Sequence, residues 1–126
     1  MNANKGSELA GWLQLRTASM FLAVLVVANL FYLGGKPASV GLFQPPMDKI
    51  AHFAIFGLMT ALVWLSMRRG NAFAVIGIVT VIGAADELHQ IFVPGRNPGW
   101  DDFAADILAE ITVAIFMYWA RLDKEQ

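Results

Sequence analysis

Four long apolar runs limit what this chain can fold into. They lie at about residues 17–33, 50–67, 72–92 and 103–120. Each run has close to the roughly 20 residues that an α-helix needs to cross a bilayer. The connectors between them, residues 34–49, 68–71 and 93–102, are too short to hold a folded domain. The sequence therefore predicts an all-α fold, an integral membrane four-helix bundle, with residues 1–126 as a single transmembrane domain.

Composition supports this class and excludes others. Of the 126 residues, 57% are hydrophobic and only 15% are charged, which is too apolar for a small soluble domain. A net charge of −1 leaves no broad basic surface, so we expect no nucleic acid partner. The chain has no cysteine, which excludes disulfides and thiolate metal sites. The first apolar run exceeds the roughly 7–15 apolar residues of a signal peptide, so we expect it to be a retained span.

The positively charged residues predict the orientation, because Lys and Arg gather on the cytoplasmic side of a membrane. In a four-span arrangement one side would hold six cations: Lys5, Arg16, Arg68, Arg69, Arg121 and Lys124. The other side would hold three: Lys36, Lys49 and Arg96. We therefore expect both termini to be cytoplasmic, and the connectors 34–49 and 93–102 to face outward.

One segment, residues 86–96, places ionisable groups at the end of an apolar run: Asp-Glu-Leu-His-Gln-Ile-Phe-Val-Pro-Gly-Arg. An ionisable residue within the hydrocarbon layer costs roughly 2.5–3.5 kcal/mol on insertion scales. A chain that keeps two carboxylates, an imidazole and an amide there is expected to use them or to pair them tightly.

Helical spacing places polar side chains on common faces, since residues three and four apart are neighbours on a helix. Each of the last three spans has one such set: Asp48, Lys49 and His52; Asp86, Glu87, His89 and Gln90; and Asp102, Asp106 and Glu110. The last set forms a stripe about 12 Å long. A stripe of carboxylates cannot face lipid, so it should face the bundle interior. We therefore expect three helices to direct polar groups into one outward-opening pocket.

Most of these residues also have a structural interpretation. Asp48, Asp101 and Asp102 stand where helix N-caps are expected. Lys49 and Arg96 could anchor helix ends at the interface. Each of the two histidines could be a hydrogen-bonded contact between helices. Three glycines are expected to permit close helix packing: Gly57, Gly77 and Gly83. The carboxylates that neither a cap nor a surface position explains are Glu87, Asp106 and Glu110.

The outward half carries seven acids against three cations, which leaves a charge of −4. One way to compensate it is a cation bound among Asp48, His52, Glu87, His89, Asp102 and Asp106. Mixed imidazole and carboxylate ligands would suit Zn²⁺ or Mn²⁺ better than Ca²⁺. The other way is shared protons, with carboxylates such as Asp106 and Glu110 protonated, together with ion pairs to Lys49 and Arg96. The sequence favours the second, and no cofactor or metal is assigned.

At these residues the chain resembles the VanZ-like family of small bacterial membrane proteins. The resemblance rests on three motifs: Asp48-Lys49-x-x-His52-Phe53, the segment 86–96, and Asp102 at the start of the last span. The family pattern has an asparagine four residues after that aspartate and a glycine three further on. This chain has Asp106 and Ala109 there, which makes the pocket more acidic. The first apolar run shares no motif with the family.

The resemblance implies a multi-pass protein of the bacterial cytoplasmic (inner) membrane. The family's namesake is associated with resistance to the glycopeptide teicoplanin. That association is a phenotype and carries no reaction, so the residues have to indicate the chemistry.

The leading functional hypothesis is a hydrolase or transferase site for a lipid or lipid-linked anionic headgroup. The expected catalytic residues are Glu87 as general base or metal ligand, His52 and His89 as proton carriers or ligands, and Asp48 as their orienting group. The expected substrate-binding residues are Lys49, Arg96, Gln90, Asp102 and Asp106. Neither serine nor cysteine belongs to the set, so an acyl-enzyme on those nucleophiles is not expected.

Two other classes remain open, and whether the chain is an enzyme is not decided. One is a non-catalytic accessory protein whose pocket binds a lipid or an antibiotic. The other is a proton or cation relay along the acidic stripe. The stripe stops near Glu110, and between Ile111 and Trp119 only Thr112 is polar apart from Tyr118 and Trp119. The expected partners are the lipid bilayer and, under the leading hypothesis, a lipid or lipid-linked headgroup, and the oligomeric state is not predicted.

Overall fold

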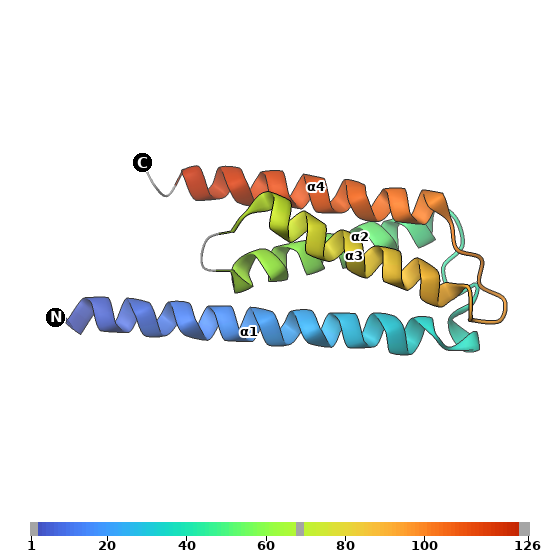
Figure 1. The fold of residues 1–126 in the computed structure, drawn as a ribbon, viewed down its shortest axis with the longest axis horizontal. Helices are drawn as coiled ribbons and strands as arrows, with labels where there is room; N and C mark the ends of the chain where they lie inside the picture. Colours follow the sequence, from blue (N-terminus) through green and yellow to red (C-terminus); the bar gives the residue numbers. More distant parts are fainter. Residues whose placement is uncertain (1–2, 68–69, 124–126) are drawn as a thin grey trace.

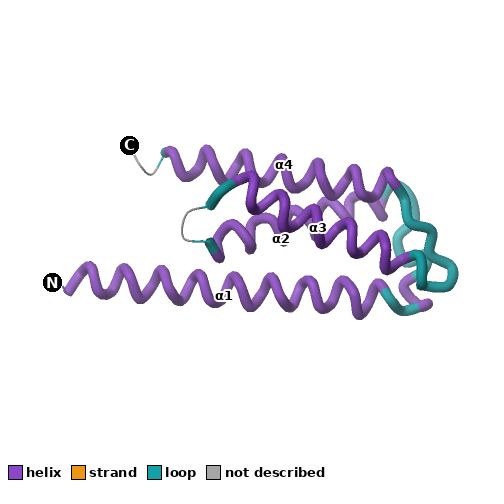
Figure 2. Tube along the Cα trace, in the orientation of Figure 1, coloured by secondary structure: helices purple, strands orange, loops and turns teal. Residues whose placement is uncertain are grey.

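The computed structural model describes residues 3–67 and 70–123, and over these ranges the chain is helical with connecting loops and no strand. Figures 1 and 2 show four long helices that run side by side as a bundle. They are α1 (Ala3–Gly34), α2 (Met47–Ser66), α3 (Ala72–Gln90) and α4 (Trp100–Leu122), with a short 3-10 helix, η1 (Pro37–Ser39), between the first two. Each long helix is long and apolar enough to cross a membrane. The chain is therefore a multi-pass membrane protein, and the expected all-α four-helix fold is confirmed.

Helix α1 is longer than its apolar run, which begins only near residue 17. It has 32 residues, against 20 in α2. At 1.5 Å per residue this corresponds to about 48 Å against about 30 Å. Leu9, Leu13 and Gln14 continue the helix toward the N-terminus, because leucine and glutamine both have high helix propensity and a helix need not be a continuous apolar run. In Figure 1 the N-terminal part of α1 extends beyond the other helices.

The ends of the other helices follow local signals. The Asn71 side chain accepts hydrogen bonds from the backbone N–H groups of Phe73 and Ala74, and so caps α3. Gly99 is the N-cap of α4, which therefore begins three residues before the apolar run. Gly95 has a φ of +85°, a conformation that favours glycine, in the turn after α3.

Helix α2 is central to the bundle, because its contacts with the other three helices are the most extensive of any helix. The core around it is apolar and includes Phe56, Met59, Val63, Val75, Val79 and Ala109. Much of the remaining apolar surface is exposed, as expected for a surface that faces lipid, with Phe73, Val81 and Phe116 among the most exposed side chains.

Two of the three expected packing glycines lie at helix contacts. A Cβ on Gly57 would lie 3.3 Å from Val113, and one on Gly83 would lie 3.2 Å from the Phe56 ring. A Cβ on Gly77 would meet nothing within 4 Å, so the prediction for Gly77 is wrong. Gly77 therefore serves as an internal control for the other two.

The start of α1 and the end of α4 lie at the same end of the bundle (Figure 1). The two long connectors, residues 35–46 and 91–99, lie together at the opposite end, which we call the motif end (Figure 2). The six-to-three count of cations rests in part on Arg68, Arg69 and Lys124, which lie outside the described residues.

Candidate functional site

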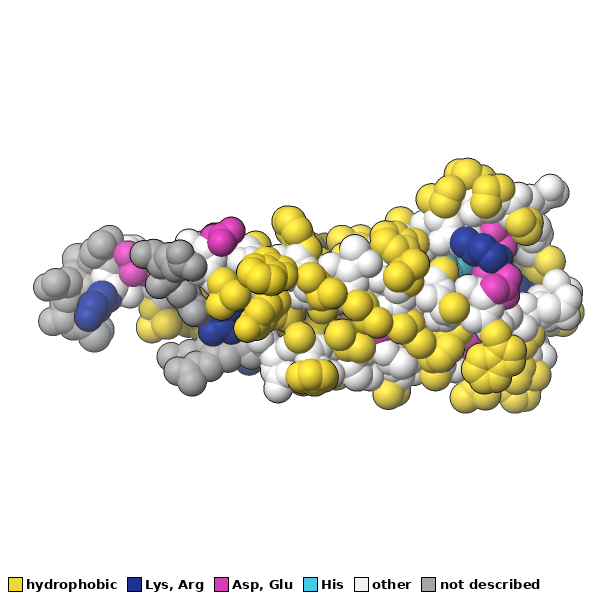
Figure 3. Space-filling model, turned by 90° about the horizontal axis from the view of Figure 1, so that it is seen from above, with side chains coloured by type: hydrophobic (Ala, Val, Ile, Leu, Met, Phe, Trp, Pro, Cys, Tyr) yellow, Lys and Arg dark blue, Asp and Glu magenta, His cyan; other side chains and the backbone are white. Residues whose placement is uncertain are grey.

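Charged side chains gather toward the two ends of the molecule, and hydrophobic side chains cover the part between them (Figure 3). At the motif end, basic and acidic groups lie directly beside one another on the face shown there. The polar residues of this end come from the start of α2, the end of α3 and the start of α4. Two groups of contacts can be distinguished, one near the surface and one inside the bundle.

The group nearer the surface, here the mouth cluster, consists of Lys49 and three carboxylates. Lys49 Nζ lies 3.2 Å from Asp48, 2.8 Å from Asp101 and 3.2 Å from Asp102. None of the three aspartates is the N-cap residue: the N-caps are Pro46 and Gly99, and neither makes a side-chain cap bond. Asp48 Oδ1 instead accepts a hydrogen bond of 2.8 Å from the backbone N–H of Lys49 within the first turn of α2. The N-cap interpretation is therefore wrong for all three aspartates. Lys49 instead links the first turn of α2 to the first turn of α4.

The group inside the bundle, here the buried cluster, brings together His52, Glu87 and Asp106 from three helices. His52 Nδ1 and Asp106 Oδ1 are hydrogen bonded at 2.9 Å, and only 1% of the Asp106 side chain is exposed. Asp106 Oδ2 is buried and has no hydrogen-bond partner. One donor atom from each of the three residues can be chosen so that all three lie within 4.8 Å of one another. The expected convergence of three spans is therefore present for these residues.

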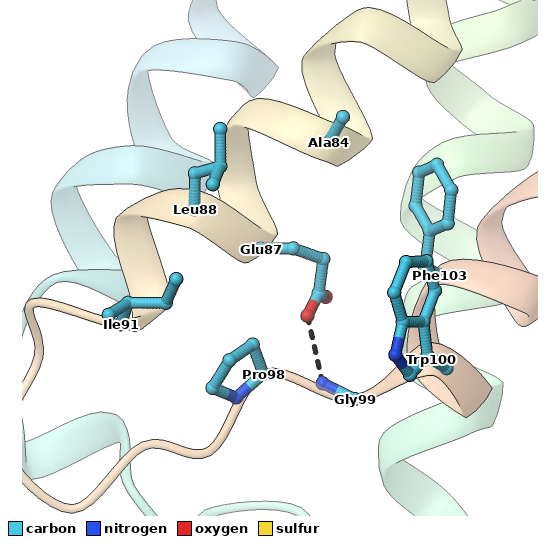
Figure 4. A pocket seen from close by; sticks show the side chains of 8 residues that line it. All are labelled: Ala84, Glu87, Leu88, Ile91, Pro98, Gly99, Trp100 and Phe103. Atoms are coloured by element: carbon cyan, nitrogen blue, oxygen red, sulfur yellow. Dashed lines mark hydrogen bonds between the residues drawn. The ribbon is translucent and has the colours of Figure 1, made fainter.

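Glu87 is held in place by two neighbours. Its Oε2 accepts a hydrogen bond of 2.9 Å from the backbone N–H of Gly99, drawn in Figure 4. The amide of Gln90 lies 3.4 Å from Glu87 Oε1 and donates a hydrogen bond of 2.9 Å to Asp86 Oδ2. Trp100 and Phe103 stand on the far side of the carboxylate in the same view. The connector before α4 thus fixes a carboxylate carried by α3.

Arg96 and His89 lie away from the buried cluster. Arg96 Nη2 donates to Ser39 Oγ at 3.3 Å, and its buried Nε has no hydrogen-bond partner. Within the described parts of the chain Arg96 makes no salt bridge, so the ion pair expected for it is not formed, whereas that expected for Lys49 is. His89 instead faces α1: its ring centroid lies 5.4 Å from that of Phe31, and its Nδ1 is buried without a partner.

The close approach of α1 to His89 requires a glycine. A Cβ on Gly35 would lie 3.0 Å from both His89 Cε1 and the Phe31 carbonyl oxygen. The end of α1 therefore packs directly against α3 at the motif end, although its sequence has no motif that indicates this.

A cavity of about 570 Å³ opens between α1 and α2 and reaches the motif end. One part of its wall is apolar and includes Leu22, Leu25, Val26, Leu30, Ile55 and Leu58. The other part is polar: Asp48, His52, Asp86, Gln90, Arg96, Asn97 and Asp102. A second pocket of about 390 Å³, between α3 and α4, is lined by Glu87 and otherwise by apolar side chains and the connector before α4 (Figure 4). We call these the α1–α2 cavity and the α3–α4 pocket.

The acidic stripe on α4 faces inward as expected. Asp106 and Glu110 are fully buried, and Asp102 is partly buried in the mouth cluster. Thr80 of α3 donates a hydrogen bond to Glu110 Oε2, while Glu110 Oε1 has no partner. Glu110 is not among the residues of the buried cluster or of either pocket wall.

Sequence reasoning missed several contributors. Asp86 lies in the conspicuous motif, and its i,i+4 spacing to Gln90 was a usable signal, yet it received no site role. Asp101 was considered only as a cap. Ser39, Asn97 and the apolar wall from α1 carried no sequence signal, since they reach the site only through the packing of α1 on α2.

Together these observations define a class: a four-helix membrane protein with a partly buried, carboxylate-rich polar site at one end of the bundle. The family model described as VanZ/LLP1 matches residues 4–121. The chain belongs to this family, as the motifs at Asp48, residues 86–96 and Asp102 indicated. Comparison with curated proteins and with solved structures gives no match.

Proposed function

We propose that the motif end faces outward from the bacterial cytoplasmic (inner) membrane and binds an amphiphile with an anionic headgroup, a lipid or a lipid-linked compound. One observation carries this proposal: the wall of the α1–α2 cavity is apolar along the two helices, with Asn29 of α1 as the exception, and polar at the motif end. This distribution matches a molecule with an acyl or prenyl chain and a polar head. Residues 1–126 would act as one transmembrane domain.

The anionic part of the headgroup would lie at Arg96. Its Nε has no partner, so the guanidinium keeps a donor for a phosphate or carboxylate oxygen. Lys49 is a weaker candidate for this role, because three carboxylates already surround its ammonium group. Asn97 and Gln90 lie on the same polar wall and would add neutral hydrogen bonds.

The chemistry we propose is hydrolysis or transfer of the headgroup, with acid–base groups from the buried cluster. His52 lines the cavity and is oriented by the buried Asp106 carboxylate, as a proton-transfer residue must be. Glu87 lines the α3–α4 pocket, and one of its carboxylate oxygens lies within 4.8 Å of a ring nitrogen of His52. In hydrolysis of a phosphoester, Glu87 would take a proton from a water between these two residues as the water oxygen bonds to phosphorus and the bond from phosphorus to the leaving oxygen breaks. His52 would give its proton to that oxygen and regain one from Glu87 through solvent.

Binding is tested with purified protein in micelles, using a fluorescent phosphatidic acid and the uncharged diacylglycerol with the same chains. We expect saturable binding of the phosphatidic acid only, weakened about tenfold by Arg96→Gln, which removes one charged contact. Lys36→Gln is the matched control: Lys36 lies over the Tyr32 ring and does not line the cavity. Equal binding of both lipids, or equal loss in both variants, would contradict the proposal.

Turnover is tested by release of inorganic phosphate from the bound lipid. Glu87→Gln keeps the volume and one acceptor oxygen of the side chain but cannot take a proton. We expect it to bind the lipid normally and to lower the rate by about 10²- to 10⁴-fold, the usual contribution of a general base. If neither the wild type nor the variant releases phosphate while both bind, hydrolysis of this lipid is excluded and the non-catalytic binding function is favoured over it.

Orientation is tested with single cysteines, since the chain has none of its own. Leu42 lies in the connector of the motif end with 68% of its surface exposed, and Gly6 lies near the other end in open space. An impermeant thiol reagent added to intact cells should label Leu42→Cys and not Gly6→Cys. The reverse pattern would place the motif end in the cytoplasm.

A further inference from the structure

The buried cluster has a property that lipid binding does not require: it assembles three metal-ligating side chains, one from each of three helices. His52 comes from α2, Glu87 from α3 and Asp106 from α4, and a donor atom of each lies within 4.8 Å of the others. Ligands a few residues apart on one helix are common by chance of sequence. Ligands from three separate helices meet only because the bundle packs them together.

We propose that His52, Glu87 and Asp106 bind a divalent transition-metal ion of the Zn²⁺ or Mn²⁺ type. One imidazole nitrogen with two carboxylate oxygens is a mixed ligand set that suits these ions, whereas Ca²⁺ takes oxygen ligands alone. Three protein ligands leave at least one coordination position for water or substrate, as in catalytic zinc sites. This inference differs from the pairing that the sequence alone favoured.

The contact between His52 and Asp106 is compatible with a shared metal ion. Their Nδ1 and Oδ1 atoms are 2.9 Å apart. Two ligands that each lie about 2.1 Å from a metal are about 3.0 Å apart at the right angle of an octahedral site and about 3.4 Å apart at the tetrahedral angle usual for Zn²⁺, so the observed separation fits an octahedral ion such as Mn²⁺ more closely. The same two atoms can therefore share a proton, as they do here, or share a cation after losing it.

A second, independent observation points to a ligand. Asp106 is fully buried, and its Oδ2 has no hydrogen-bond partner. A carboxylate oxygen without a partner in a bundle interior is costly unless something compensates it. None of the three lysine and arginine side chains of the motif end fills this role: Lys49 lies in the mouth cluster, Arg96 contacts Ser39, and Lys36 lies over the Tyr32 ring. A divalent cation would compensate both carboxylates of the cluster at once.

The surroundings of the buried cluster orient one ligand, Glu87, and leave room for water to reach the ion. The N–H of Gly99 and the amide of Gln90 orient the Glu87 carboxylate, as outer-shell hydrogen bonds do in metal sites. His52 lines the α1–α2 cavity, and Glu87 lines the α3–α4 pocket. Water can thus reach the cluster from either side. With the ion bound, Glu87 would be a ligand, and the ion, rather than Glu87 as a base, would activate the attacking water.

The test needs no lipid, so it stands apart from the proposed function. Protein stripped with chelator is titrated with Zn²⁺ and with Mn²⁺, and bound metal is measured by elemental analysis after gel filtration. We expect one ion per chain for at least one of the two metals. Loss of an outer-shell partner alone costs about 10- to 100-fold in affinity. The ligand substitutions Glu87→Gln and Asp106→Asn should therefore each weaken binding by at least about tenfold.

The matched control is Glu110→Gln. Glu110 is also a fully buried carboxylate of α4, one turn beyond Asp106, but it is outside the cluster. This variant should bind metal like the wild type. If it loses as much affinity as Asp106→Asn, the metal responds to overall charge and the proposed site is wrong.

A spectroscopic measurement on the unaltered protein keeps the proposal testable if a variant does not fold. Pulsed electron paramagnetic resonance of the Mn²⁺ form should show coupling to an imidazole ¹⁴N, and His52→Gln should remove it. A Mn²⁺ form without a nitrogen coupling would overturn the proposal, and so would the absence of saturable binding of both metals.

Discussion

The mouth cluster and the buried cluster use the same acidic residue type and solve the problem of its charge differently. In the mouth, three aspartates surround one lysine, and 37% of the Lys49 side chain remains exposed. Inside, Asp106 is hydrogen bonded only to His52 and keeps an unsatisfied oxygen, while Glu87 is held by neutral donors of Gly99 and Gln90. The first arrangement is complete without any additional group, whereas the second is not.

This difference in charge compensation indicates which carboxylates to regard as functional. A charge near the surface with a mobile cation beside it is compensated by that cation and by solvent, so it indicates structure as readily as function. A buried carboxylate with an open acceptor site indicates a missing partner. By this reasoning Asp106, rather than Asp48, Asp101 or Asp102, is the more informative aspartate of the motif end.

The largest expected effect comes from breaking the buried pair. His52→Leu leaves the Asp106 carboxylate buried without its hydrogen-bond donor, and removal of one partner of a buried pair costs about 3–5 kcal/mol. The double variant His52→Leu/Asp106→Leu removes both polar groups and should recover most of that loss. The free energy of unfolding is measured in micelles with chelator present. A loss below about 1 kcal/mol in the single variant would show that the buried cluster behaves like a surface pair.

A smaller effect is expected from crowding the buried cluster. A Cβ on Gly83 would lie 3.2 Å from the Phe56 ring and 3.5 Å from Asp106 Oδ2, so Gly83→Val should push both away. Overpacking of this kind costs about 1–3 kcal/mol. Gly77→Val on the same helix is the control, because a Cβ there meets nothing within 4 Å. Equal thermal stability of the two variants would mean that α3 and α4 are not closely packed at the cluster.

Sequence alone indicated much of this arrangement. The length of the apolar runs predicts four helices, and the i,i+4 spacing of Asp106 and Glu110 predicts which face of α4 is buried. The sequence could not show that Glu87 and His89, two residues apart, have separate surroundings, since this depends on how α1 packs against α3. Nor could it show that Lys49 has partners on another helix while Arg96 turns to Ser39, because long side chains select partners only once the connectors are folded.

The smallest loss of stability is expected at the mouth cluster, and its dependence on salt should distinguish this cluster from the buried cluster. Lys49→Gln removes the cation shared by Asp48, Asp101 and Asp102, but 65% of the Asp101 side chain is exposed and solvent can take over part of the compensation. Exposed charges are screened at high ionic strength, whereas buried ones are screened much less. The drop in melting temperature should therefore be a fraction of that for His52→Leu, and should shrink further in high salt, while the loss in His52→Leu should persist.

Lys5→Gln, a change of the same kind on an exposed residue far from the motif end, serves as the control. A drop for Lys49→Gln that equals that of His52→Leu and is unaffected by salt would mean that the mouth cluster is as dependent on its cation as the buried cluster is on its histidine.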